Sequence, residues 1–247
     1  MPPQSPEPPR STLPGSPPAV PRQVVPAEPV EKPAGPPAVC IVLDPAHGGS
    51  DSGAHVAAAE EGVPAEKDLV LTIAQGMRRE LERQGARVLL TRQSDVSLSI
   101  DERAALVNGT AQCFFVSLHI GSSGRPDTAV AYSFGAPTGG APPVVLPHPA
   151  GLLAIRWEEA QNAYLVASRR LAELVQVELA QKLPGSPDVP QLAEVRQLRV
   201  VARPAVAIEL ASVAEENPES LVRTAAPLAS ALLRAVAAYR QSGGGLH

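Results

Sequence analysis

Hydrophobic and polar residues follow two alternating patterns from residue 38 onward. Short apolar runs bounded by turn residues predict buried strands. These runs lie at 38–44, 86–92, 113–119, 128–134, 195–201 and 205–210. Between the first two runs, apolar side chains recur at four-residue steps over 67–83, which predicts an amphipathic helix ending at Gly85. Further helices are expected at 100–107, capped by Ser99, at 156–182 and at 218–240.

This alternation of strands and helices predicts the fold class. We expect an α/β fold, a single domain with a mostly parallel, mixed central sheet flanked by helices on both faces. In such sheets ligands bind at the carboxyl ends of the strands. Polar residues at those ends are therefore the first candidates for function.

The first 37 residues differ from the rest of the chain. They hold 14 of its 28 prolines and no aromatic residue. Proline lacks an amide donor, and the segment has too few apolar side chains to offset the entropy of ordering it. We therefore divide the chain into a disordered Pro-rich linker, 1–37, and one folded domain, 38–247. A linker of this kind suggests an anchor or targeting segment further upstream.

Composition narrows the possible partners. The net charge is −4, with no basic stripe, so we expect no nucleic-acid partner. The two cysteines, Cys40 and Cys113, are too few for a cysteine-built zinc site. Burial as two small side chains is the simplest interpretation of both.

Three strands end near residues that can bind metal or move protons. The run 38–44 leads to His47, the run 113–119 ends at His119, and the run 205–210 contains Glu209. Parallel strands would bring these side chains to one edge, and Glu66 stands at the start of the following helix. Two histidines and a carboxylate form a known catalytic zinc set. The alternative is a turn histidine at 47 and a core histidine at 119. His55, His148 and His247 fit solvated surface better.

The sequence also resembles a known protein family. Five blocks carry the resemblance, in order along residues 39–240: LDPAHGGSDSGA at 43–54, EKD at 66–68, TRQSDVSLSIDERAALVN at 91–108, FVSLHI at 115–120 and PAVAIEL at 204–210. Together they resemble the zinc-dependent N-acetylmuramoyl-L-alanine amidases of the AmiC type, which are cell-wall hydrolases. The resemblance implies cleavage of the amide between N-acetylmuramic acid and the L-alanine of the stem peptide.

The resemblance also implies roles for particular residues. The metal ligands fall on His47, Glu66 and His119, holding one Zn²⁺ per chain, and the catalytic general base falls on Glu209. The resemblance thereby selects Glu66, over its neighbours Glu60 and Glu61, as the carboxylate ligand. A helix N-terminus also favours the anionic form of Glu66. The family's usual pattern is changed at Ala46, which replaces a glycine, and in the segment ELASVAEENPES after Glu209.

Four other residues have roles that the sequence leaves open. Asp44 either hydrogen-bonds a ligand histidine or fixes the turn. Arg103 and Asn108 suit a structural role on a helix surface and at its C-cap. Arg92 is either a substrate-carboxylate ligand or a solvated charge at a strand end.

Several functional alternatives also stay open. The enzyme could be a zinc carboxypeptidase or endopeptidase acting elsewhere in peptidoglycan, or the domain could bind peptidoglycan without cutting it. Glu158 or Glu159 could block the zinc if that segment folded back. Cys40 and Cys113 precede the two histidines by seven and six residues, so a disulfide between them is open too. We expect a monomer that acts on peptidoglycan in the periplasm or outside the cell.

Overall fold

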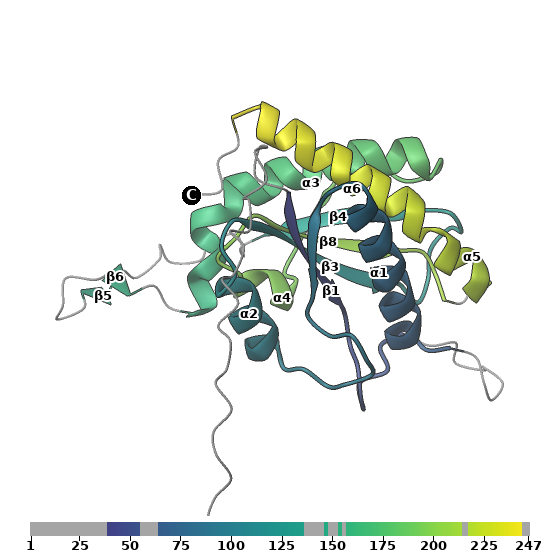
Figure 1. The fold of residues 1–247 in the computed structure, drawn as a ribbon, viewed down its shortest axis with the longest axis horizontal. Coiled ribbons are helices and arrows are strands. Elements are labelled where there is room, and N and C mark those ends of the chain that lie inside the picture. The colour runs from purple at the N-terminus through teal and green to yellow at the C-terminus, as the bar shows by residue number, and fades with distance from the viewer. Residues whose placement is uncertain are drawn as a thin grey trace, which may run out of the picture. The chain divides into compact units, whose positions relative to one another are not determined.

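The computed structural model describes residues 39–54, 64–135, 146–147, 153–154, 157–213 and 217–243. The predicted linker, His55, His148, His247, Glu60 and Glu61 lie outside these ranges. The described part forms a six-stranded sheet with helices on both faces, as the sequence predicts. Figure 1 shows this arrangement.

The sheet is mixed, with the strand order β2-β1-β3-β8-β4-β7. Four strands run parallel: β1 (Cys40–Pro45), β2 (Arg87–Leu90), β3 (Cys113–Ile120) and β8 (Ala205–Leu210). The strand β4 (Ala129–Phe134) runs antiparallel to β8, and β7 (Gln191–Ala193) pairs parallel with β4 at the edge. A separate two-stranded pair joins β5 (Leu146–Pro147) and β6 (Leu153–Ala154).

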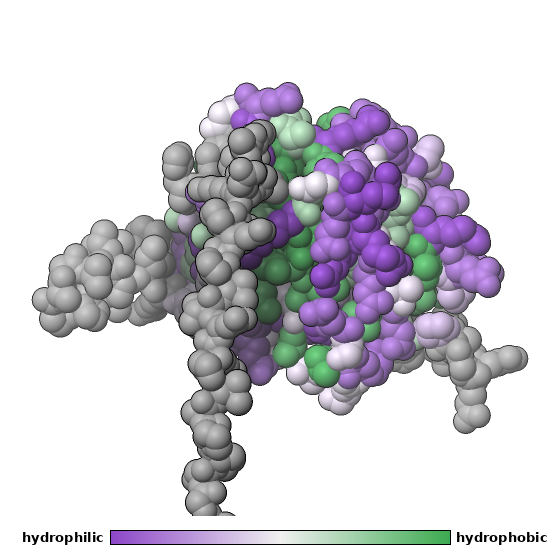
Figure 2. Space-filling view, in the orientation of Figure 1, coloured by the Kyte–Doolittle hydropathy of each residue, from purple (hydrophilic) through white to green (hydrophobic). Residues whose placement is uncertain are grey.

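Three long helices cover one face of the sheet. They are α1 (Glu66–Arg83), α3 (Leu165–Lys182) and α6 (Ala225–Gln241), and α6 packs across the other two (Figure 1). Every second strand residue points into this larger core; Ile41, Phe114 and Ile208 are examples. On the view in Figure 2, hydrophilic side chains cover the outer surface of α1. The larger core therefore lies under amphipathic helices.

The opposite face carries a smaller core. Here α2 (Ile100–Asn108) and α4 (Arg196–Arg199) contribute Val107 and Leu198, which pack on Val42, Phe115 and Ala207 of the strands. A capping box starts α2: the Ser99 side chain accepts from the Glu102 amide, and the Glu102 carboxylate accepts from the Ser99 amide. The same face carries His119 and Glu209, because they share the strand parity of Phe115 and Ala207.

Three element predictions need correction. The run 195–201 is not a strand; it contains the short helix α4, and β7 precedes it. The predicted helix 156–182 is a 3₁₀ segment, η1 (Trp157–Tyr164), followed by α3. The predicted helix 218–240 divides at Thr224 into α5 (Pro218–Arg223) and α6.

The segment Pro218–Gln241 is the one described stretch long and apolar enough, by length and composition, to cross a membrane. Core helices pass the same test. Many α6 side chains, including Leu228, Leu232 and Val236, are fully buried in the larger core. Packing within the domain therefore accounts for the apolar character of α6.

A disulfide joins β1 to β3. Cys40 and Cys113 are directly paired in the parallel register and are bonded, with their Cα atoms 4.5 Å apart. Both cysteines are buried, as the simplest interpretation of the sequence predicts. They also form the disulfide that the sequence left open. The disulfide ties together the two strands that lead to His47 and His119.

Candidate metal centre

The structure brings His47, Glu66 and His119 together at the carboxyl edge of the sheet. His47 follows β1, Glu66 is the first residue of α1, and His119 is the penultimate residue of β3. One ligand atom from each lies within 4.8 Å of the others, and within the described residues no other His, Cys, Asp or Glu joins the group. The two imidazole rings stand perpendicular, with centroids 5.4 Å apart.

Glu66 is the buried member of this cluster. Its Oε2 accepts the Ala54 amide at 2.7 Å, and its Oε1 accepts the Ile120 amide at 2.9 Å. Each oxygen also faces one imidazole: His47 Nε2 at 3.1 Å and His119 Nδ1 at 3.3 Å. Burial raises the pKa of Glu66, but the hydrogen bonds from both histidines and both amides outweigh it, and the pKa falls to about 2. Glu66 is therefore held as an anion.

His47 is oriented from its far side. Its Nδ1 lies 2.9 Å from the Asp51 carboxylate, so Nε2 is the nitrogen that faces Glu66. The hydrogen bond to Glu66 raises the pKa of His47; burial opposes the shift and Asp51 adds to it. Asp51, which the sequence did not single out, lies only four residues after His47, and that spacing within the turn was the available signal.

The donor set fits a zinc ion. Zinc is bound by imidazole nitrogens and carboxylate oxygens at about 2.0–2.2 Å, and a tetrahedral ion with such bonds separates neighbouring ligands by about 3.3 Å. The two N···O separations, 3.1 and 3.3 Å, are close to this value. Since three protein ligands leave a fourth position open, the cluster suits a catalytic site better than a closed structural one.

Glu209 lies beside the cluster without joining it. It pairs in register with His119 on the adjacent parallel strand, so both side chains leave the same face of the sheet. Tyr132 of β4, another residue that the sequence did not single out, places its hydroxyl 3.5 Å from Glu209 Oε1. Burial raises the pKa of Tyr132, and the Glu209 carboxylate adds to the shift. Glu209 thus lies in register beside His119, with its carboxylate next to the Tyr132 hydroxyl.

Two buried arginines hold the turn that carries His47. Arg92 donates to the carbonyls of Pro45, Ala46 and Lys67 at 2.7–2.9 Å. It is buried, so it is neither the substrate ligand nor the solvated charge that the sequence offered as alternatives. Arg103 donates to the carbonyl of His47 at 2.6 Å and pairs with the Asp44 carboxylate.

The other expected supporting residues are also structural. Arg103 is buried under the turn instead of lying on a helix surface. Asn108 bonds Val200 and Ala202, tying the end of α2 to the segment before β8. Asp44 is fully buried and accepts from the side chains of Thr91, Arg103 and Ser117. It does not bond a histidine directly, since it reaches His119 through Ser117.

The structure gives no support to a plug formed by Glu158 or Glu159. Glu158 pairs with Arg199 of α4, with 3.4 Å between the carboxylate and the guanidinium. Neither carboxylate belongs to the metal-binding group. The described part of this segment packs along α3 and α4 and leaves the metal position free of both carboxylates.

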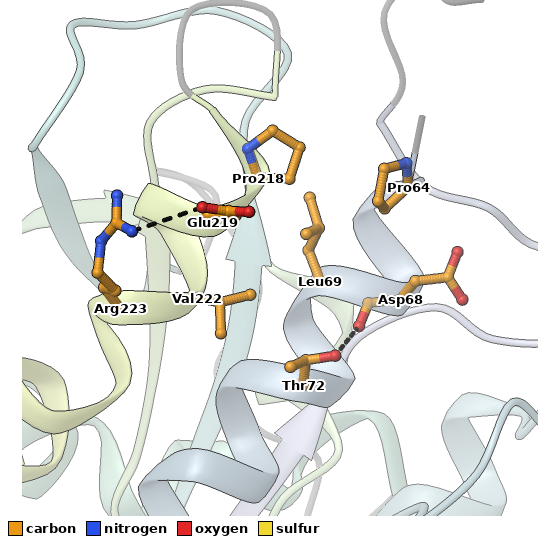
Figure 3. A pocket seen from close by; sticks show the side chains of 8 residues that line it. All are labelled: Pro64, Asp68, Leu69, Thr72, Pro218, Glu219, Val222 and Arg223. Atoms are coloured by element: carbon orange, nitrogen blue, oxygen red, sulfur yellow. Dashed lines mark hydrogen bonds and ion pairs between the residues drawn. The ribbon is translucent and has the colours of Figure 1, made fainter. Parts of the chain in front are cut away.

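A pocket of about 430 Å³ opens between α5 and the first turns of α1, close to Glu66. Figure 3 shows its two walls: Leu69 rises from α1 in the direction of Pro218, which stands with Val222 on the α5 side, and Glu219 pairs with Arg223 on that same side. None of the three cluster residues lines it. The pocket is therefore a neighbour of the metal centre, not the metal centre itself.

The fold and the cluster together define an α/β domain with a candidate metal site of two histidines and one carboxylate. The model of the N-acetylmuramoyl-L-alanine amidase family matches residues 41–238, and the chain belongs to this family. The resemblance inferred from the five sequence blocks is thereby confirmed.

Individual relatives agree with this membership. The chain is 38% identical over 104 residues to the sporulation-specific N-acetylmuramoyl-L-alanine amidase of Bacillus subtilis, which is 40% of this chain and 39% of that protein. It is 38% identical over 82 residues to the amidase AmiC of Escherichia coli, which is 33% of this chain and 19% of AmiC. The matches thus span well under half the length of these relatives.

Solved structures share the fold. The N-acetylmuramoyl-L-alanine amidase of Clostridium difficile 630 superposes with a TM-score of 0.60 at 22% identity, covering 84% of this chain and 99% of that one. AmiC2 of Nostoc punctiforme gives a TM-score of 0.56 at 23% identity, covering 82% and 97%. At these identities the likeness establishes the fold alone.

Proposed function

We propose that this chain hydrolyses the amide bond between N-acetylmuramic acid and the L-alanine of the peptidoglycan stem peptide. One observation carries the proposal: a chain of the amidase family places His47, Glu66 and His119 in one cluster, with Glu209 in register beside His119. We propose zinc as the metal, because two imidazoles and one carboxylate with an open fourth position form a catalytic zinc set.

The chemistry divides between the ion and the chain. When bound, zinc would activate a water molecule and polarise the lactyl carbonyl of the substrate. Glu209 would accept a proton from that water and deliver it to the L-alanine nitrogen as the C–N bond breaks. The products would be a lactyl carboxylic acid and a free L-alanine amine. Glu209 is better placed off the metal, since a second carboxylate ligand would reduce the net positive charge that activates the water.

The variant Glu209→Gln tests whether proton transfer belongs to Glu209 and metal binding to the other three residues. The variant should bind zinc as the wild type does, because Glu209 lies outside the ligand group. Its rate on purified peptidoglycan should fall at least about 10²-fold, the usual contribution of a general base. Glu82→Gln, on the exposed side of α1, is the matched control and should keep the wild-type rate. A Glu209→Gln chain that cuts at the wild-type rate would show that another group moves the proton.

Two other activities predict different products. A zinc carboxypeptidase or endopeptidase would cut within the peptide and leave L-alanine attached to N-acetylmuramic acid. A silent binding domain would release nothing. Retention of Glu209 beside the cluster favours cleavage, and family membership favours the amide next to the sugar.

We further propose that the chain acts outside the cytoplasm. The Cys40–Cys113 disulfide supports this, because disulfides persist mainly in oxidising compartments. Relatives that include proteins named as probable cell wall amidases, from staphylococci, agree with such a location. The Pro-rich segment 1–37 as a linker to an upstream anchor, and a monomeric state, remain parts of the proposal.

A further inference from the structure

Tyr132 of β4 lies on the same face of the sheet as Glu209. The strands β4 and β8 are antiparallel, with Tyr132 opposite Ala207 and Val130 opposite Glu209. Tyr132 is therefore a diagonal neighbour of Glu209, at a separation that an aromatic side chain can span. Ala207 carries only a methyl group, which leaves room for the phenol ring to extend toward the carboxylate. The register of the sheet thus brings the two side chains together.

The hydroxyl of Tyr132 is directed at one oxygen of that carboxylate. It donates to Glu209 Oε1 across 3.5 Å, and the ring packs against the smaller core. Burial raises the pKa of Tyr132 and the carboxylate adds to the shift, so the phenol keeps its proton at neutral pH and stays a donor. The usual length of such a bond is about 2.5–3.0 Å, and hydrogen bonds in active sites often tighten when the substrate binds.

The other described neighbours of Glu209 supply no second donor. Within the described residues, the Tyr132 hydroxyl is the only group that hydrogen-bonds the Glu209 carboxylate. Gly121, directly after β3, borders the same oxygen, because a Cβ there would lie 3.4 Å from Oε1. Since glycine has no side chain, this position adds no polar group. In the described part of the chain, the orientation of the carboxylate therefore depends on Tyr132, and Oε2 makes no hydrogen bond.

We propose that Tyr132 is a positioning residue that holds Oε1 of Glu209, so that Oε2 takes the proton of the attacking water. The inference rests on the proposed function and adds a residue to it. A glutamate side chain samples many rotamers unless a partner fixes it. A general base works only within hydrogen-bond reach of the proton that it accepts. Loss of the hydroxyl should therefore slow proton transfer without changing how metal or substrate binds.

The variant Tyr132→Phe removes the hydroxyl and keeps the ring. Its kcat on a soluble muropeptide should fall about 10-fold, while KM and zinc affinity stay as in the wild type, because the lost bond orients only the base. Tyr239→Phe is the matched control, since Tyr239 is buried against Phe114 in the larger core on the other face of the sheet. It should keep the wild-type kcat. An unchanged kcat in folded Tyr132→Phe overturns the inference, and so does a change confined to KM.

A double-mutant cycle separates this positioning role from a direct action on the substrate. The slow residual hydrolysis by the Glu209→Gln chain is followed over long digestions. Adding Tyr132→Phe to that chain should change its rate by less than about twofold, because the effects of residues that act as a unit do not add. A further loss of about 10-fold, as in the wild-type background, would mean that Tyr132 acts without Glu209 and would overturn the inference.

The contact itself can be measured without substrate. ¹³C spectra of the tyrosine rings of the full chain follow the titration of each phenol, and the Tyr132 signal is assigned by its absence from Tyr132→Phe. This phenol should titrate at a higher pH in the wild type than in Glu209→Gln, because a neighbouring carboxylate disfavours the phenolate. Identical titrations overturn the inference. If instead the wild type releases no product from peptidoglycan, the proposed function fails, and the spectra still report whether the contact exists.

Discussion

At the scale of single residues, the backbone of His47 is the unusual feature of the centre. Its φ is 61°, a left-handed conformation that is uncommon for residues other than glycine. The Arg103 guanidinium holds its carbonyl, and Asp51 holds its ring. Ala46, where the family usually has glycine, does not have positive φ, so the methyl group there meets no backbone restriction. The left-handed backbone therefore belongs to a proposed metal ligand, His47 itself.

Gly53 is a second position where the backbone limits the side chain. Its φ is 68°, and a Cβ there would lie 2.5 Å from Glu66 Oε2 and 2.6 Å from His47 Cδ2. Gly53→Ala should therefore displace two ligands and weaken zinc binding, as chelator competition would show. It should also lose about 1–2 kcal/mol of stability through the left-handed backbone.

Gly85→Ala separates these two effects. Gly85 has a φ of 84° but open space around it. Its alanine variant should therefore lose stability through the left-handed backbone and still bind zinc as the wild type does. Equal zinc affinity in the two alanine variants would show that Gly53 does not support the ligands.

The sequence predicts some of these residues and not others. His47, Glu66, His119 and Glu209 could be singled out because strand ends and motif blocks mark them. Arg92 and Arg103 could not be placed, since a charged side chain near a strand end or on a short helix is usually solvated. Their burial depends on carbonyls of the 45–47 turn, and only the tertiary fold brings these close.

At the scale of elements, Arg103, a residue distant in the sequence, holds the turn after β1. Arg103 neutralises Asp44, which is fully buried, and bonds two carbonyls of the turn. Removing one partner of a buried ion pair leaves an uncompensated charge, so Arg103→Ala should cost about 3–5 kcal/mol of stability. Urea unfolding of the metal-free chain measures this.

Arg78→Ala is the comparison. Arg78 pairs with Glu82 on the exposed surface of α1, where such pairs contribute about 0.2–1 kcal/mol. Similar losses for the two variants would mean that the Asp44–Arg103 pair does not hold the turn.

The wrong prediction of a strand at 195–201 has a local cause. The run VRQLRVV at 195–201 is too short for its apolar residues to distinguish a strand from a helix, and it contains α4. The direction of β4, antiparallel to β8, also leaves no local mark, because both kinds of strand show similar apolar patterns. The long amphipathic helix α1, with a clear period, was predicted within a residue of both its ends.

At the scale of the whole molecule, the disulfide closes a large loop. It links residues 73 apart in the sequence, and the loop contains both His47 and Glu66. In the chain-entropy model such a crosslink contributes roughly 4 kcal/mol by restricting the unfolded chain. Reduction of the metal-free chain should therefore lower its free energy of unfolding by about that amount in urea. The effect is specific, because the sequence has no other cysteines.

Thiol titration checks the premise of that prediction. The unfolded, unreduced chain should show no free thiol, and two free thiols per chain would exclude the bond. Finding no free thiol also bears on where the chain acts. A disulfide formed during expression in an oxidising compartment supports action outside the cytoplasm.

The central claim is that the cluster of His47, Glu66 and His119, with Glu209, cleaves the amide next to the sugar. Mass spectrometry of purified peptidoglycan digested by the zinc-loaded full chain tests it most directly. The account predicts intact stem peptides with a free L-alanine amine, together with glycan strands whose lactyl groups end in carboxylic acids. Products cut only within the peptide, or no products from a zinc-loaded and folded chain, would contradict it.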